Sequence, residues 1–102
     1  MIYVKVHSTE NGAILAMCDS SLVDRVLVEG DVEINIRDYA DFYKGQLLSK
    51  ESSRGAIKKA EIVSANIIGE ESVGVALDEQ IIRRENIRTV MKVPYANAFR
   101  IK

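Results

Sequence analysis

Apolar residues recur at helical spacing in the segment that follows Gly69. The members of this stripe are Val73, Ala76, Leu77 and Ile81. Glu70 and Glu71 fall in the first turn, where acidic side chains complement the helix dipole. The pattern predicts a helix that begins near Gly69, ends by Ile82 and packs its apolar stripe against a sheet.

Alternating apolar and polar residues predict a strand at residues 2–7, and a second apolar segment follows at residues 13–18. The Asn11-Gly12 dipeptide between them favours a two-residue hairpin turn, because both residue types tolerate positive backbone angles. In that register His7 lies opposite Ala16. We therefore expect an antiparallel hairpin at the start of the chain.

The middle of the chain contains another alternating segment and another predicted helix. Residues 26–36 predict a strand that bends at Gly30. Ser49 can cap a helix that runs to about Glu61. Residues 62–68 fit either a continuation of this helix or a short buried strand.

The last part of the chain is predicted to be extended. Residues 87–93 predict a strand, residues 94–97 a turn that begins at Pro94, and residues 98–101 a terminal strand. The order of elements predicts an α+β fold, with two helices packed on a largely antiparallel sheet. Residues 1–102 are expected to form one small domain.

The composition supports this single folded domain. Of the 102 residues, 47% are hydrophobic and 28% are charged, a mixture typical of globular proteins. No segment approaches the ~18 consecutive apolar residues that span a bilayer, so we expect a cytoplasmic protein with no membrane partner. Cys18 is the only cysteine, which excludes an intrachain disulfide and a cysteine-rich zinc site.

Charge is distributed unevenly along the chain. Residues 1–49 contain four basic and eight acidic residues, whereas residues 50–102 contain ten basic and seven acidic residues. The second half is therefore the better place for an anionic partner.

Basic and aromatic residues point to contact with RNA. Lys50, Arg54 and Lys58 follow one another at four-residue spacing and would share one face of a helix. The set predicted to contact nucleic acid is Lys50, Arg54, Lys58, Lys59, Arg83, Arg84 and Arg88, with Tyr39, Tyr43 or Tyr95 as platforms for unpaired bases. A solvated polar face, which any surface helix has, is the alternative interpretation.

Catalytic chemistry has little support in the residue types present. His7 and Cys18 would be diagonal neighbours in the predicted hairpin, too far apart for a catalytic pair, whose reacting atoms lie within ~3 Å. One histidine and one cysteine cannot supply a zinc site. Glu70 and Glu71 would repel a phosphate at the Gly69 helix start. We predict no catalytic residues, no metal and no cofactor.

Five short segments of the chain resemble an archaeal family of about this length, the domain of unknown function 424. They are residues 1–6 (MIYVKV), 16–19 (AMCD), 42–45 (FYKG), 66–70 (NIIGE) and 93–96 (VPYA). The resemblance implies an archaeal, cytosolic protein with a loose link to RNA or translation. It marks Asn66, Gly69, Glu70 and Pro94 as motif residues that serve the fold or a binding site. The family pattern tends to place a histidine after the proline, and Tyr95 at that position argues against histidine-dependent chemistry.

The leading hypothesis is a small non-enzymatic binding protein associated with RNA or translation, which uses a basic surface in residues 50–102. Its partners would be RNA or ribosome-associated factors. The alternative is a protein-interaction module or homo-oligomer that uses a sheet edge or the aromatic loop at residues 37–45. A third class, a cysteine-dependent enzyme, would rely on Cys18.

Overall fold

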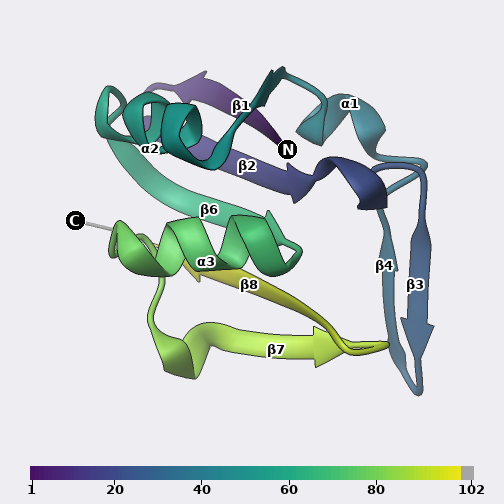
Figure 1. The fold of residues 1–102 in the computed structure, drawn as a ribbon. Coiled ribbons are helices and arrows are strands. Elements are labelled where there is room, and N and C mark those ends of the chain that lie inside the picture. Colours follow the sequence, from purple (N-terminus) through teal and green to yellow (C-terminus); the bar gives the residue numbers. More distant parts are fainter. Residues whose placement is uncertain (100–102) are drawn as a thin grey trace.

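A six-stranded sheet forms the centre of the computed structural model, which describes residues 1–99 (Figure 1). The strand order is β5-β1-β2-β6-β8-β7. The strands span β1 Ile2–Thr9, β2 Gly12–Asp19, β5 Gln46–Leu48, β6 Ile62–Ile68, β7 Ile87–Val90 and β8 Val93–Phe99. β2 and β6 run parallel, and every other neighbouring pair in this sheet is antiparallel. The predicted α+β fold with a largely antiparallel sheet is confirmed.

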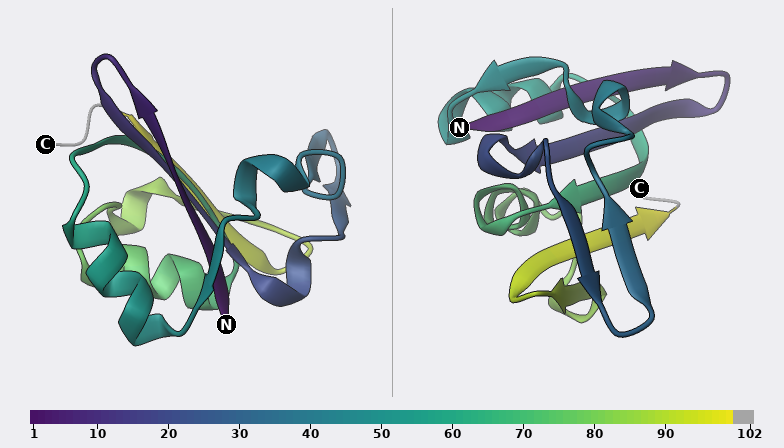
Figure 2. Two further views of the ribbon diagram at one scale, coloured as in Figure 1. Left: turned by 90° about the horizontal axis from the view of Figure 1, so that it is seen from above. Right: turned by 90° about the vertical axis from the view of Figure 1, so that its right-hand side faces the viewer.

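Two helices cover one face of the sheet, and smaller elements cover part of the other. Figure 2 shows α2 (Lys50–Lys58) and α3 (Glu70–Asp78) together on one side. The opposite side carries α1 (Ala40–Tyr43), a short 3-10 helix and a separate hairpin of β3 (Val26–Glu29) and β4 (Val32–Asn35). No helix within residues 1–99 is long and apolar enough to cross a membrane.

The apolar pattern of the strands explains the two layers. In β6, Ala65 and Ile67 are fully buried in the core beneath α2 and α3, whereas Ser64 and Asn66 point the other way and are half-buried. Ser49 caps α2 as predicted, since its hydroxyl accepts a hydrogen bond from the Ser52 amide at 3.1 Å. Residues 62–68, for which helix and strand were both open, form a central strand.

The start of α3 is capped by a residue from a distant strand. The Asp19 carboxylate, at the end of β2, accepts hydrogen bonds from the Glu71 amide at 3.1 Å and from the Ser72 amide and hydroxyl, each at 2.8 Å. Gly69 has φ +110°, and a Cβ atom there would overlap this carboxylate. Glycine is therefore required both by the backbone angle and by the space that Asp19 occupies.

The predicted register of the first hairpin is wrong. Thr9 pairs with Gly12, and His7 lies opposite Ile14 rather than Ala16. The Thr9 hydroxyl holds the turn by donating to the Gly12 carbonyl at 2.6 Å and accepting from the Asn11 amide at 3.2 Å. Gly12 has φ +130° and lies tightly against Val63, so this glycine begins β2 instead of occupying the turn.

Three other predicted boundaries also differ from the structure. Residues 94–97 were predicted as a turn but lie in β8, and the turn falls at Met91 and Lys92, whose φ angles are 50° and 65°. Residues 26–36 form two strands rather than one bent strand. The helix predicted to reach Ile82 ends at Asp78, so Ile81 lies beyond it; Leu77 and Ile81 are both only partly buried against the core. Residues 100 and 101 of the predicted last strand lie outside the described residues.

Candidate functional site

The part of the sheet that no helix covers carries an unusual set of polar and aromatic side chains. We call it the open face and define it by the side chains that point away from α2 and α3 and reach the surface: Ser64, Asn66, Arg88, Tyr95, Asn97 and Phe99. Phe99 is 74% exposed. Asn66 and Asn97 lie directly opposite each other on β6 and β8. Each of these two asparagines lines a different cleft.

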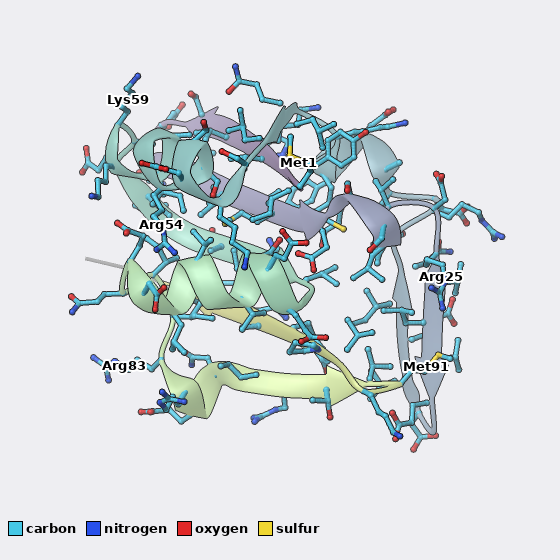
Figure 3. All side chains as sticks on the ribbon, viewed as in Figure 1. Met1, Arg25, Arg54, Lys59, Arg83 and Met91 are labelled. Carbon is cyan, nitrogen blue, oxygen red and sulfur yellow. The ribbon has the colours of Figure 1, made fainter. Side chains whose placement is uncertain are left out.

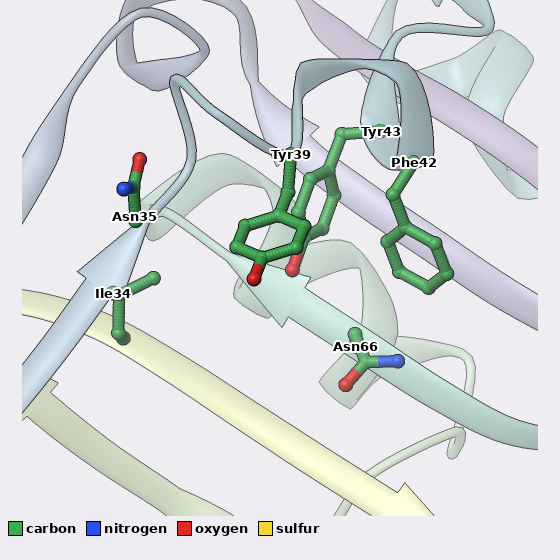
Figure 4. A pocket seen from close by; sticks show the side chains of 6 residues that line it. All are labelled: Ile34, Asn35, Tyr39, Phe42, Tyr43 and Asn66. Carbon is green, nitrogen blue, oxygen red and sulfur yellow. The ribbon is translucent and has the colours of Figure 1, made fainter.

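The first cleft lies between α1, β4 and the sheet and has a volume of about 350 Å³. We call it the aromatic cleft; its lining residues are Ile34, Asn35, Tyr39, Phe42, Tyr43 and Asn66 (Figure 4). Phe42 and Tyr43 meet edge to face with ring centroids 5.1 Å apart. Behind them, the His7 ring stacks on Phe42 at 4.5 Å. The cleft is therefore walled largely by aromatic rings, with one amide on the side of the sheet.

The hydrogen-bonding groups of the aromatic cleft are of two kinds. His7 Nε2 lies 2.9 Å from the Phe42 carbonyl, and Asn35 exchanges two hydrogen bonds with Asp38, so these residues are engaged within the protein. The hydroxyls of Tyr39 and Tyr43 and the side-chain amide of Asn66 make no side-chain hydrogen bond within residues 1–99. These three groups are available to a ligand or to water.

Two titratable groups near this cleft have shifted pKa values. Burial, and next the neighbouring Cys18, raise the pKa of Tyr43 to about 12, so its hydroxyl remains a hydrogen-bond donor at neutral pH. Hydrogen bonds from Asn35 and then Arg37 lower the pKa of the exposed Asp38 carboxyl. Asp38 therefore stays ionised and holds the loop between β4 and α1.

The second cleft is polar and has a volume of about 270 Å³. We call it the polar cleft; its lining residues are Glu85, Asn86, Arg88, Tyr95 and Asn97. Arg88 on β7 lies opposite Tyr95 on β8, and Asn97 lies opposite Asn66, which lines the aromatic cleft. The open face and the aromatic cleft beside it therefore offer aromatic rings, two amides and a guanidinium.

The residues predicted to contact nucleic acid are divided between the two sides of the sheet. Tyr43, Tyr95 and Arg88 line the two clefts. Arg54 lies between α2 and α3 on the opposite side, where its guanidinium contacts Asp78 at 3.2 Å and Glu79 at 3.5 Å (Figure 3). Lys58 Nζ is 3.8 Å from Glu79. Two of the three basic residues of the predicted helical stripe, Arg54 and Lys58, are therefore paired with carboxylates at and just after the end of α3.

The other predicted basic residues lie at the surface but do not join one cluster. Lys50 and Lys59 are exposed on and just after α2, and Arg83 and Arg84 are exposed in the segment before β7. Regular spacing along the sequence predicted a shared helical face for Lys50, Arg54 and Lys58. It carried no information on the acidic residues of α3 that lie beside that face.

The motif residues serve the fold more than a site. Gly69 makes room for Asp19, and its amide donates to the Pro94 carbonyl at 2.8 Å, which joins β6 to β8. Glu70 is exposed in the first turn of α3. Asn66 is the member of the motif that lines a cleft.

Phe42 and Asn97 were not among the residues predicted to contact nucleic acid, whereas Tyr39 was predicted with Tyr43 and Tyr95 as a possible platform for unpaired bases. Phe42 belongs to the aromatic loop at residues 37–45, which was predicted only as an alternative protein-interaction site, and the clustering of rings there was the signal that could have identified it. Asn97 was hidden because residues 94–97 were predicted to form a turn.

The structure gives little basis for chemistry at Cys18. The thiol is fully buried, and burial followed by the charge of Asp19 raises its pKa to about 12, so it is protonated at neutral pH. Cys18 pairs with Tyr3, whereas His7 pairs with Ile14, four residues along β2. Within residues 1–99 no three His, Cys, Asp or Glu side chains are grouped so as to hold a metal.

Comparison with known proteins identifies a family and a similar structure. The family model described as "Protein of unknown function (DUF424)" matches residues 6–101. No curated protein matches the chain. A crystal structure of an uncharacterized conserved protein from Methanopyrus kandleri is similar, with a TM-score of 0.75 and 22% sequence identity over 98% of this chain and 91% of that one. At this identity the likeness shows a shared fold.

Proposed function

We propose that this chain, which belongs to the DUF424 family of proteins of unknown function, binds single-stranded RNA across the open face. The observation that carries this proposal is that the two clefts lie next to each other, since Asn66 lines one, Asn97 lines the other, and the two residues are directly opposite on β6 and β8. Exposed bases need aromatic rings to stack on, amides that read their edges and a cation for the backbone, and this face offers all three. A cytoplasmic location, where RNA is available, is part of the proposal.

The dimensions of the sheet support a short oligonucleotide rather than a duplex. Neighbouring strands lie ~4.8 Å apart, so the path from β6 through β8 to β7 is ~10 Å long. This is the scale of about two or three nucleotides, whose backbone repeats at a few ångströms each. Duplex RNA hides its base edges and would not use aromatic rings set in a cleft.

The distribution of charge favours the open face over α2. The guanidinium of Arg54 and the ammonium of Lys58 already contact carboxylates of α3, and a phosphate would have to displace these ion pairs. Arg88 forms no ion pair within residues 1–99 and lines the polar cleft. Its contact with a phosphate requires no such displacement.

Salt-dependent binding of an unstructured RNA oligonucleotide tests the proposal. Fluorescence anisotropy should give a Kd that weakens with salt, and Arg88→Gln should reduce the slope of log K against log salt by ~0.7, the value for one phosphate contact on a single strand. Lys50→Gln, a matched loss of one exposed charge on α2, should leave the slope unchanged. Absence of RNA binding at low salt, or loss through Lys50→Gln but not Arg88→Gln, would contradict it.

A second candidate, self-association, is favoured by the edge of β1. β5 pairs only with Ile2, Tyr3 and Val4, so residues 5–9 have no outer strand partner within residues 1–99. A trough of about 550 Å³ lies beside this edge, and Val6 on its lining is 39% exposed. Residues 5–9 can pair antiparallel with the same residues of a second copy, centred on His7, and cover Val6.

Sedimentation equilibrium tests this second candidate. Dimerisation should be lost in Val6→Lys, which puts a charge into the trough, and kept in the control Val28→Lys, whose wild-type side chain is 51% exposed on β3. A wild-type chain that remains monomeric at high concentration would exclude self-association through this edge.

A further inference from the structure

The walls of the aromatic cleft are fixed by contacts that are independent of any ligand. The His7 ring supports Phe42 from behind, and the Lys5 ammonium donates to the Asp41 carbonyl, so α1 is tied to β1 at two points. On the other wall, the Asn35 amide donates to the Asp38 carboxylate at 2.8 Å and its oxygen accepts from the Asp38 amide at 2.9 Å. A cleft held in this way needs little rearrangement to accept a ligand.

The free hydrogen-bonding groups of the cleft come together on one side of it. Figure 4 shows the rings of Tyr39 and Tyr43 extending from the α1 segment toward β6, the strand that carries Asn66. Asn66 is half-buried on β6 and lines the cleft, and its side-chain amide has no hydrogen-bond partner within residues 1–99. A ligand in the cleft can therefore use its donor and acceptor.

The lining excludes most classes of ligand. No basic side chain lines this cleft, so a phosphate or a carboxylate would find no cation there. Ile34, Phe42 and Tyr43 present apolar surface to the interior, which suits a flat uncharged ring. A ring that also presents neighbouring donor and acceptor groups on one edge would satisfy the Asn66 amide, and nucleobases have this property.

We propose that the aromatic cleft is a nucleobase pocket: one unpaired base enters between the rings of Tyr39 and Phe42, and its edge is hydrogen-bonded by Asn66 and Tyr43. The ribose and phosphate leave the cleft past Asn97 toward Arg88. This inference rests on the proposed RNA binding but makes a separate claim. A pocket that reads the base must also bind a free nucleoside, which has no phosphate.

NMR titration with the four free nucleosides tests the pocket directly. Millimolar nucleoside should shift the side-chain amide signals of Asn66 and leave those of Asn97 largely unchanged. Tyr39→Ala should weaken nucleoside binding about 5-fold or more, the loss expected for one stacking ring. Because Tyr39 is 65% exposed, this variant should fold normally. Asn66→Ala should weaken binding and reduce the difference in affinity among the four nucleosides.

Arg88→Gln separates the pocket from the RNA-binding face as a whole. This variant should weaken binding of the RNA oligonucleotide and leave nucleoside affinity unchanged, because a nucleoside carries no phosphate. If RNA binds but nucleosides do not shift Asn66, and Tyr39→Ala leaves RNA affinity intact, the pocket is refuted and RNA binding stands. If nucleosides bind at Asn66 and RNA does not bind, the pocket stands and RNA binding across the face is refuted. Binding of neither ligand would overturn both.

Discussion

The two faces of the sheet are built from alternate residues of the same strands, yet they differ in how their side chains are used. Beneath α2 and α3, Ile67 and Ala96 are fully buried in one apolar core. Their sequence neighbours Asn66 and Asn97 point to the open face, where one is half-buried and the other exposed. Side chains on the helix-covered face form the hydrophobic core, whereas the polar side chains on the open face are not part of that core.

The polar residues of the helix-covered side show the same contrast. Arg54 and Lys58 form ion pairs with Asp78 and Glu79. On the open face, Asn66 and Arg88 have no such partners within residues 1–99. The difference teaches that basic residues in a regular pattern can serve stability, while single polar residues on a central strand are better candidates for ligand binding.

The largest difference between the two faces should appear in stability. Ile67→Ala removes a fully buried side chain from the core and should lower the free energy of unfolding by ~2–5 kcal/mol. Asn66→Ala, one residue away on the open face, should change it by less than ~1 kcal/mol, since no hydrogen bond within the protein is lost. Urea denaturation of both variants measures the contrast. Equal losses would show that the open face is also part of the core.

Much of the fold could be predicted because local patterns determine it. The start of α3, the Ser49 cap and the burial of Val4 and Met17 on one face of the first hairpin follow from spacing and residue type. The hairpin register did not follow, because Gly12 begins β2, where an added Cβ would meet Val63, and the local Asn-Gly pattern carries no information on that distant residue. The parallel pairing of β2 and β6 is likewise a long-range choice that no local pattern encodes.

The candidate site could be predicted only in part. Tyr43, Tyr95 and Arg88 were identified by residue type, and they line the two clefts. Their grouping with Arg54 and Lys58 was an inference from sequence proximity. The fold instead puts a sheet between these two sets.

The next largest loss of stability should come from substitutions at the start of α3, where Gly69 lies against the Asp19 carboxylate. Gly69→Ala should lower the free energy of unfolding by ~1–3 kcal/mol, because φ +110° is strained for alanine and the added Cβ displaces Asp19. Asp19→Ala should itself be destabilising, through loss of the cap and of the Ser72 hydrogen bonds. The double variant should cost less than the sum, because part of the alanine penalty comes from the Asp19 carboxylate. Strict additivity in chemical denaturation would disprove the shared contact.

Alkaline pH should destabilise the folded protein through Cys18 and Tyr43, which are buried and half-buried, respectively. Cys18 and Tyr43 both have a pKa raised to about 12, above ordinary values of 9.0 and 10.0. The unfolded chain therefore loses these protons first, and stability that is complete below pH 9 should fall as pH rises toward 12, by at most ~1.4 kcal/mol per pH unit for each group. Denaturation at a series of pH values checks this, with Cys18→Ala expected to flatten the dependence. A native thiol that reacts rapidly at pH 8 would contradict its burial.

The smallest effect should be found at the ion pairs of the helix-covered side. Arg54→Gln removes contacts with both Asp78 and Glu79 and should cost ~0.2–1 kcal/mol, because the pairs are partly exposed and screened by water. High salt should reduce this cost, whereas Lys50→Gln, which removes an exposed charge outside these pairs, should have no measurable effect on stability. The same two variants should bind RNA as the wild type does. If Arg54→Gln left stability unchanged but abolished RNA binding, RNA would contact the side of the sheet that carries α2 and not the open face.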